Sequence, residues 1–262
     1  MFDIFEQVKN ANTIAISGHV RPDGDCIGSC LGLYLYLKKR MPEARIKVYL
    51  EEPDASFKSI PSIGEIDSTF APADDYDVFI LLDTVPERLG DAQPFFDSAK
   101  KKINIDHHIS NIDGAGDVNY IDPKAAATGM LVYNVIDKAY MDADIAALLY
   151  MAIAHDTGVF RFSNTSPDTL RVVADLLEFK FDFSKLLDQT FFEKTYLQNC
   201  TQGRIVLDSK LYYDGLVIVG CADASFMKQY GVTKNDFDGV VNQLMLTQNV
   251  EAAVFAYEKT PG

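Results

Sequence analysis

Histidine and aspartate side chains occur together at several places in this sequence, and they are the residues best suited to chemistry. The chain has only four histidines, and each lies near an aspartate at the end of an apolar run. Imidazole and carboxylate groups are ligands for divalent cations such as Mn²⁺, Mg²⁺, Co²⁺ and Zn²⁺. The pattern therefore predicts a metal site, and its candidate residues are His19, Asp23, Asp25, Asp83, Asp106, His107, His108 and Asp156.

Apolar segments that end at these residues predict the strands of a parallel sheet. The segments are 13–17, 76–82 and 100–106, and a helix is expected to end at His155. The carboxyl ends of parallel strands meet at one edge of a sheet, so the polar residues that follow them should converge. Unpaired carboxylates would repel one another there. Two divalent cations about 3.5–4 Å apart would relieve that repulsion and form a hydrolytic centre.

Each part of this pattern also has a simpler interpretation. An aspartate after a strand often caps a helix, and Asp23-Gly24-Asp25 or His107-His108 could form solvated turns. His155 could equally well be a structural residue. Their joint occurrence at strand and helix ends still favours a metal site.

Strands and helices alternate along most of the chain, which predicts an α/β fold. A parallel sheet with helices on both faces is expected, with further strands at 45–50 and 118–121 and helices near 1–11, 26–41, 94–98, 125–140, 144–155 and 167–178. Residues 160–163 are expected to be extended. The main domain would span 1–185, followed by a connecting helix over 186–204. A smaller α+β domain over 205–262 would contain a hairpin at 210–220, a helix at 235–248 and a strand at 252–257.

Composition narrows the class of protein. The net charge is −14, which argues against binding of long duplex nucleic acid, because neutralising phosphates requires Lys and Arg. No apolar run is long enough to span a bilayer, and the acidic N-terminus does not resemble a signal peptide. The four cysteines form no CxxC pair, which is typical of reduced thiols. A cytoplasmic protein without a membrane partner is expected.

Four motifs in this order resemble the DHH phosphoesterase family. They are His19-Val20-Arg21-Pro22-Asp23-Gly24-Asp25, Asp83, Asp106-His107-His108 and Asp156-Thr157-Gly158, within residues 14–165. The run 156–165 resembles the subgroup with oligoribonuclease (nanoRNase) and 3′-phosphoadenosine 5′-phosphate (PAP) phosphatase activity. That subgroup carries a smaller C-terminal DHHA1 domain, which matches the second unit expected here.

The resemblance implies two Mn²⁺ ions, with Mg²⁺ or Co²⁺ as alternatives, bridged by Asp83. The first ion would also be held by His19 and Asp23, and the second by Asp25, His107 and Asp156. The same resemblance implies a catalytic role for the remaining two residues of the third motif. His108 would hold no metal and would contact the phosphate or protonate the leaving oxygen, while Asp106 would orient a histidine.

The implied substrates are short oligoribonucleotides, linear dinucleotides such as pApA, and PAP, and relatives of this type suggest a homodimer. The family's Gly-Gly-Gly-His run, which grips the terminal phosphate, is absent before Gly262, so the DHHA1-like domain is expected to be truncated. Arg88, Arg161 and Arg204 are candidate substitutes, and a surface salt bridge is the alternative for each.

Two other functions stay open. A family II inorganic pyrophosphatase would need a Ser-Arg-Lys-Lys-type segment that this sequence lacks, and a non-catalytic dinucleotide-binding module would need no activated water.

Overall fold

The computed structural model describes residues 2–71 and 75–258 and forms two compact units, Met1–Phe192 and Glu193–Gly262. Residues 259–262, where the absence of the Gly-Gly-Gly-His run was noted, lie outside the described residues. None of the helices in the described part of the chain is long and apolar enough to cross a membrane.

The first unit contains a five-stranded sheet in the order β2-β1-β3-β4-β5, and all its neighbouring strands run parallel. β3 is Val-Phe-Ile-Leu-Leu and is buried throughout, as expected of a strand covered on both faces. The chain moves from β1 outward to β2 and then returns to the other side of β1 as β3. The loops after β1 and β3 therefore flank the point where the strand order reverses, which is where open α/β sheets bind ligands. The strands are β1 (Thr13–Ser17), β2 (Arg45–Tyr49), β3 (Val78–Leu82), β4 (Lys101–Asp106) and β5 (Val118–Ile121).

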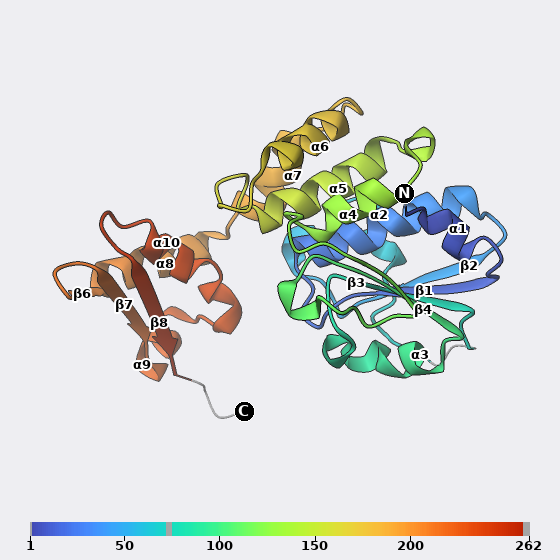
Figure 1. Ribbon diagram of the computed structural model, residues 1–262. Helices are drawn as coiled ribbons and strands as arrows, with labels where there is room; N and C mark the ends of the chain where they lie inside the picture. The colour runs from blue at the N-terminus through green and yellow to red at the C-terminus, as the bar shows by residue number, and fades with distance from the viewer. Residues whose placement is uncertain (1, 72–74, 259–262) are drawn as a thin grey trace. The chain divides into compact units, whose positions relative to one another are not determined.

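Helices cover both faces of this sheet, which confirms the predicted α/β architecture. α2 (Gly24–Arg40), α4 (Thr128–Val135) and α5 (Ala143–Asp156) lie on one face, and α3 (Gln93–Ser98) lies on the other (Figure 1). The remaining helices of the unit are α1 (Ile4–Val8), α6 (Pro167–Leu177) and α7 (Phe183–Leu187).

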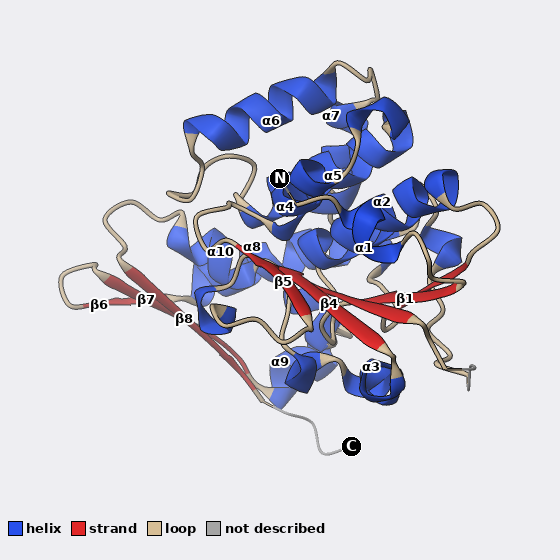
Figure 2. Cartoon of the chain, turned by 45° about the vertical axis from the view of Figure 1, so that its right-hand side comes forward, coloured by secondary structure: helices blue, strands red, loops and turns tan. Residues whose placement is uncertain are grey.

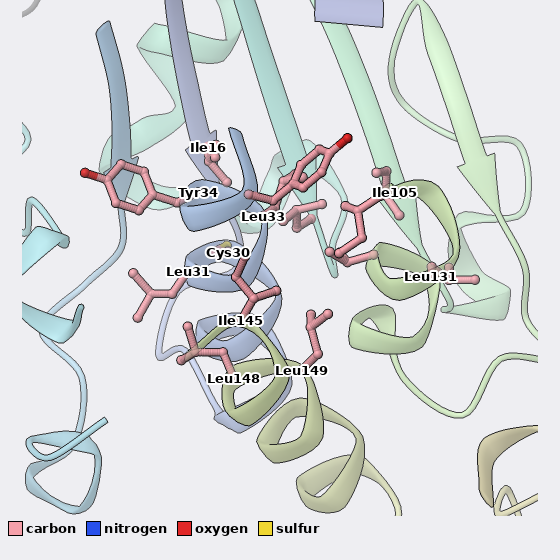
Figure 3. Close-up of a cluster of buried hydrophobic side chains, with 14 of the residues drawn as sticks. Ile16, Cys30, Leu31, Leu33, Tyr34, Ile105, Leu131, Ile145, Leu148 and Leu149 are labelled. Atoms are coloured by element: carbon pink, nitrogen blue, oxygen red, sulfur yellow. The ribbon is translucent and has the colours of Figure 1, made fainter. Parts of the chain in front are cut away.

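The main core lies between the sheet and the helices α2 and α5. Leu31 of α2 and Leu148 of α5 are fully buried there, together with Ile105 of β4 (Figure 3). Burial of each such side chain stabilises the fold by roughly 1.5–3 kcal/mol. Gly28 allows the two helices to approach closely, because a Cβ at this position would lie 2.4 Å from the Leu148 carbonyl oxygen. This packing fixes the start of α2 and the end of α5, both of which carry candidate metal ligands.

The second unit has a three-stranded sheet with helices packed against it (Figure 2). β6 and β7 form the expected hairpin, with Tyr213, Asp214 and Gly215 in left-handed conformation at the turn. β8 pairs with β7 in parallel. The elements are α8 (Tyr196–Asp208), β6 (Lys210–Tyr212), β7 (Val217–Ala222), α9 (Ala224–Tyr230), α10 (Val240–Met245) and β8 (Ala252–Tyr257).

Two expected elements of the first unit differ from the structure. The helix expected over 125–140 extends only from Thr128 to Val135, because Ile136 is extended and a separate 3₁₀ turn follows at Lys138–Tyr140. The segment expected to be extended at 160–163 is part of a turn, in which Gly158, Val159 and Phe160 are all left-handed.

Two further helices are interrupted. The helix expected over 186–204 divides into the end of α7, a π-helical turn Asp188–Phe192 and α8, which starts with a capping box at Thr195. The helix expected over 235–248 divides at Gly239, whose φ is +72°, into a 3₁₀ turn Lys234–Phe237 and α10.

Candidate metal centre

His19 and Asp23 lie in the loop between β1 and α2 and face each other. The His19 Nδ1 lies 3.0 Å from the Val20 carbonyl oxygen, which can only accept, so this nitrogen carries the proton. The Nε2 then points to Asp23 Oδ2 at 3.6 Å and to Asp83 Oδ2 at 3.5 Å. Asp23 is also the N-cap of α2, and its Oδ1 accepts the N–H groups of Asp25 and Cys26. One oxygen of Asp23 thus starts the helix and the other faces the site.

Asp83 follows β3 and lies at the middle of the centre. Its φ is +60°, a left-handed conformation that aspartate tolerates better than most residues, and it is only 2% exposed. Its Oδ2 faces His19, whereas its Oδ1 lies 3.6 Å from His107 Nε2 and accepts the Thr128 hydroxyl at 3.0 Å. The two oxygens of one carboxylate therefore face two separate groups of ligands.

Asp25 connects the start of α2 to the start of α4. It is 1% exposed, and its Oδ1 accepts the Ser29 hydroxyl and the Gly129 N–H, both at 2.9 Å. Its Oδ2 accepts the Thr128 N–H at 2.7 Å. Ala127, the N-cap of α4, has no side chain that could satisfy these N–H groups, so the Asp25 carboxylate serves as the cap. These bonds also explain why α4 begins at residue 128.

His107 and Asp156 complete the second group. The His107 Nδ1 lies 3.2 Å from the Ala125 carbonyl oxygen, which can only accept, so Nε2 is the nitrogen that could bind a cation after losing its proton. This Nε2 lies 3.1 Å from Asp156 Oδ2 and 3.7 Å from Asp25 Oδ2. It is buried, and among the described residues it has no hydrogen-bond partner. A buried imidazole nitrogen that faces several carboxylate oxygens is in the environment of a metal ligand.

The charges in the centre are unbalanced without a cation. Burial raises the pKa of Asp25, and the neighbouring Asp83 and Asp156 raise it further. Burial also raises the pKa of Asp83, although a hydrogen bond to His19 opposes the change. Burial lowers the pKa of His19, but hydrogen bonds to Asp23 and Asp83 outweigh it and raise the value to about 11. The folded chain therefore attracts positive charge here, and the oxygen and nitrogen donors fit divalent cations.

Ligand-capable atoms form three close groups among the described residues, each within 4.8 Å. The groups are His19 with Cys26 and Asp83, Asp83 with His107 and His108, and Asp25 with His107 and Asp156. Cys26 was expected to be core filler. Its Sγ also belongs to the group with His19 and Asp83, and burial raises the pKa of its thiol, so the thiol is protonated.

His108 is bound to Asp106 and is partly open to solvent. Its Nδ1 donates to Asp106 Oδ1 at 2.7 Å, and its side chain is 40% exposed. The bond to Asp106 raises the pKa of His108 despite its partial burial. Burial would raise the pKa of Asp106, but the hydrogen bonds from His108 and Asn111 outweigh it and lower the value. The pairing thus favours the charged form of the Asp106 carboxylate and the protonated form of the His108 imidazole.

The three arginines expected near the substrate have different environments. Arg88 is exposed, and its carbonyl oxygen accepts the Val20 N–H at 2.8 Å, next to His19. Arg161 is exposed in the turn after Asp156, and no ion pair involves it within the described residues. Arg204 belongs to the second unit, where it pairs with Asp208 at 2.7 Å.

The His155 ring packs against aromatic side chains and the backbone of Gly24, although the residue directly precedes Asp156. A Cβ at Gly24 would lie 2.2 Å from its ring, and Phe57 and Phe191 pack against the same ring. Its Nε2 lies 3.2 Å from the Thr190 hydroxyl. Burial lowers the pKa of His155 to about 4, so it is neutral near pH 7. These contacts favour the structural role among the two considered for this residue.

Sequence reasoning missed several residues that support the centre. Four of them form hydrogen bonds to Asp25, Asp83 or Asp106, and these are Ser29, Asn111, Thr128 and Gly129. The fifth, Asn104, accepts a hydrogen bond from Asn111. Thr128-Gly129 was noted only as the region of a helix start, and the asparagines gave no signal in the sequence.

Comparison with known proteins agrees with this geometry. Residues 13–153 match the model of the DHH family, N-terminal domain. The chain is 30% identical over 254 residues to a bifunctional oligoribonuclease and PAP phosphatase NrnA of Thermus thermophilus, covering 95% of this chain and 74% of that protein. It is 29% identical to the protein of the same name from Bacillus subtilis, covering 98% of this chain and 81% of that protein.

A solved structure shares the fold. The crystal structure of an exopolyphosphatase-related protein from Bacteroides fragilis matches with a TM-score of 0.87 at 23% identity, covering 98% of this chain and 79% of that one. The matched region of the family contains His19, Asp23, Asp25, Asp83 and the Asp106-His107-His108 run. This chain belongs to the DHH family of phosphoesterases.

Proposed function

We propose that this chain is a Mn²⁺-dependent phosphoesterase that hydrolyses short oligoribonucleotides, linear dinucleotides such as pApA, and PAP. The observation that carries the proposal is the Asp83 carboxylate, whose two oxygens face two groups of imidazole and carboxylate ligands. The printed names of the two relatives, oligoribonuclease and PAP phosphatase, support the substrate class.

One cation would be held by His19, Asp23 and Asp83, and the other by Asp83 and the second group. That second group comprises Asp25, His107 and Asp156. When bound, two such cations would supply a water molecule of lowered pKa and neutralise charge on the phosphoryl oxygens. Mn²⁺ is proposed because mixed carboxylate and imidazole donors suit it, and Mg²⁺ and Co²⁺ are the cations to compare.

His108 would act on the leaving group. Its Nδ1 is committed to Asp106, so its Nε2 is the nitrogen that could face a substrate. Hydrolysis forms a bond between water oxygen and phosphorus and breaks the bond to the leaving oxygen. Water loses one proton to the solvent, the leaving oxygen gains one from His108, and His108 then regains a proton from the solvent. Arg88 and Arg161, in loops beside His19 and Asp156, are the proposed contacts for other substrate phosphates.

Assays of purified protein with Mn²⁺ test this function. Release of mononucleotide from a diribonucleotide and from pApA, and of phosphate from PAP, is expected, with pyrophosphate as the comparison substrate. Asp83→Ala should abolish turnover, because both groups lose a ligand. Absence of turnover with every nucleotide by metal-loaded wild type would refute the proposal. Binding of a dinucleotide without hydrolysis would instead support a binding module.

A further inference from the structure

A buried chain of amide and carboxylate groups lies behind His108. The Asn111 Nδ2 donates to Asp106 Oδ2 at 2.7 Å and to Asn104 Oδ1 at 2.8 Å, and it also lies 3.2 Å from the Thr84 carbonyl oxygen. The Asn104 Nδ2 in turn donates to the carbonyl oxygens of Leu81 and Thr84. The three side chains are at most 5% exposed. Within the described residues, both carboxylate oxygens of Asp106, both polar side-chain atoms of Asn104 and the Asn111 Nδ2 therefore have a partner.

The orientation of the Asn111 amide follows from its neighbours. All three atoms around its Nδ2 are oxygens that accept hydrogen bonds, so the reversed amide would place its own oxygen against them. Asn104 lies two residues before Asp106 on β4, and so both side chains point to the same face of the sheet. Asn111 joins these two side chains from outside the strand.

Asn111 also shapes the backbone that carries His108. Its N–H donates to the His108 carbonyl oxygen at 3.0 Å and so begins the turn Ile109–Asn111. The backbone of Asp106 is fixed by β4 and by the N–H of Asp122, which donates to its carbonyl oxygen. With the backbone fixed, the Asp106 carboxylate could still change its orientation by rotation of the side chain. Among the described residues, Asn111 is the hydrogen-bond donor to Asp106 Oδ2.

We propose that Asn111, supported by Asn104, is a positioning residue that holds Asp106, and through it His108, in the orientation needed for proton donation. This inference rests on the proposed function. Asp106 Oδ1 can accept both the N–H and the Nδ1–H of His108 because Asn111 holds Oδ2. Without Asn111, a fully buried carboxylate oxygen would be unpaired, and the carboxylate would turn to find another donor.

Kinetics of Asn111→Ala, His108→Ala and the double variant test the mechanism. Asn111→Ala should lower kcat for a dinucleotide about 10–100-fold with little change in KM, as loss of a supporting group typically does. The loss should be small with a p-nitrophenyl ester of a mononucleotide, whose leaving group needs no proton. The double variant should be no slower than His108→Ala alone. Asn119→Ala is the matched control, because the exposed side chain of Asn119 bonds only to the Gly116 backbone in the described structure.

Multiplicative losses in the double variant, or equal losses with both leaving groups, would show a purely structural role and overturn the inference.

A second measurement needs no turnover. Nitrogen NMR of the four histidines should show the hydrogen-bonded Nδ1–H of His108 in wild type and Asn119→Ala, and its loss in Asn111→Ala. An unchanged His108 signal would overturn the proposal. If wild type hydrolyses no nucleotide, the proposed function fails, while this signal still reports on the positioning by Asn111.

Discussion

Asp83→Asn separates the charge of the central carboxylate from its shape. Asparagine adopts the left-handed conformation at φ +60° about as readily as aspartate, so the loop after β3 should keep its backbone. The amide oxygen can still accept the Thr128 hydroxyl in place of Oδ1. The amide nitrogen replaces Oδ2, which faces His19, and an amide nitrogen does not bind cations. The variant should therefore fold and lose the bridge between the two ligand groups.

The effect of Asp83→Asn on the free energy of unfolding should depend on Mn²⁺. Without the cation the variant should be no less stable than wild type, and with it the variant should be less stable. Burial raises the pKa of Asp83, and each unit of that change corresponds to about 1.4 kcal/mol of cost for the charged form, so the metal-free variant should be no less stable than wild type. For wild type, Mn²⁺ at 100 times its Kd should stabilise the folded state by about 2.7 kcal/mol for each site. For a unit as large as Met1–Phe192, this corresponds to a rise in Tm of roughly 5–11 °C.

Calorimetry of both proteins with and without Mn²⁺, together with the dinucleotide assay, measures these effects. Asp83→Asn should lose most of the Mn²⁺-dependent rise in Tm and nearly all turnover. Asp113→Asn, which removes a charge from an exposed residue of the same unit, should retain both. A variant that kept the wild-type Tm rise and activity would refute the bridging role of Asp83.

Three further results are expected. Gly24→Ala should lower the free energy of unfolding by about 1–3 kcal/mol, because its Cβ would lie 2.2 Å from the His155 ring; unchanged Tm would contradict this packing. Thr128→Val should weaken Mn²⁺ binding in calorimetric titration, since Asp83 loses a buried hydrogen bond worth about 1.5–3 kcal/mol; wild-type affinity would argue against that role. Burial lowers the pKa of His107, but carboxylates outweigh it and raise the value from 6.5 to about 9. The folded metal-free chain then holds more protons than the unfolded chain, so urea denaturation should show stability falling from pH 6.5 to 9, and a rise would be inconsistent.

Local patterns in the sequence predicted most of the scaffold. The buried strand β3 reads as an uninterrupted apolar run, and Asp83 follows it directly, so both the strand and the polar residue at its end were visible. The hairpin β6-β7 was predicted from its Asp-Gly turn for the same reason, because a left-handed turn needs such residues. Signals of this kind depend on neighbours in the chain.

Contacts between distant segments could not be predicted in this way. The bond from Thr128 to Asp25 joins residues 103 positions apart, and it decides where α4 begins. Asn111 follows Asp106 by only five residues, but it reaches the carboxylate because the chain turns back toward β4 through η5 (Ile109–Asn111). The environment of His155 depends on Gly24, which is the one residue type that leaves room for its ring. In each case the side chain gives no periodic or turn-forming signal, and its role follows from tertiary packing.

The capping of α4 by Asp25 has a consequence for how such a chain can diverge. A descendant that no longer bound metal would still need an acceptor at position 25 to satisfy the N–H groups of Thr128 and Gly129. Position 23 would also still need an acceptor, since Asp23 caps the first N–H groups of α2. Within the described residues, no backbone N–H group bonds to the Asp156 carboxylate, which lies 3.1 Å from His107 Nε2. In a relative that had lost catalysis, substitution of Asp156 would therefore disturb the fold less than substitution of Asp23 or Asp25. Position 156 is where we expect such a relative to change first.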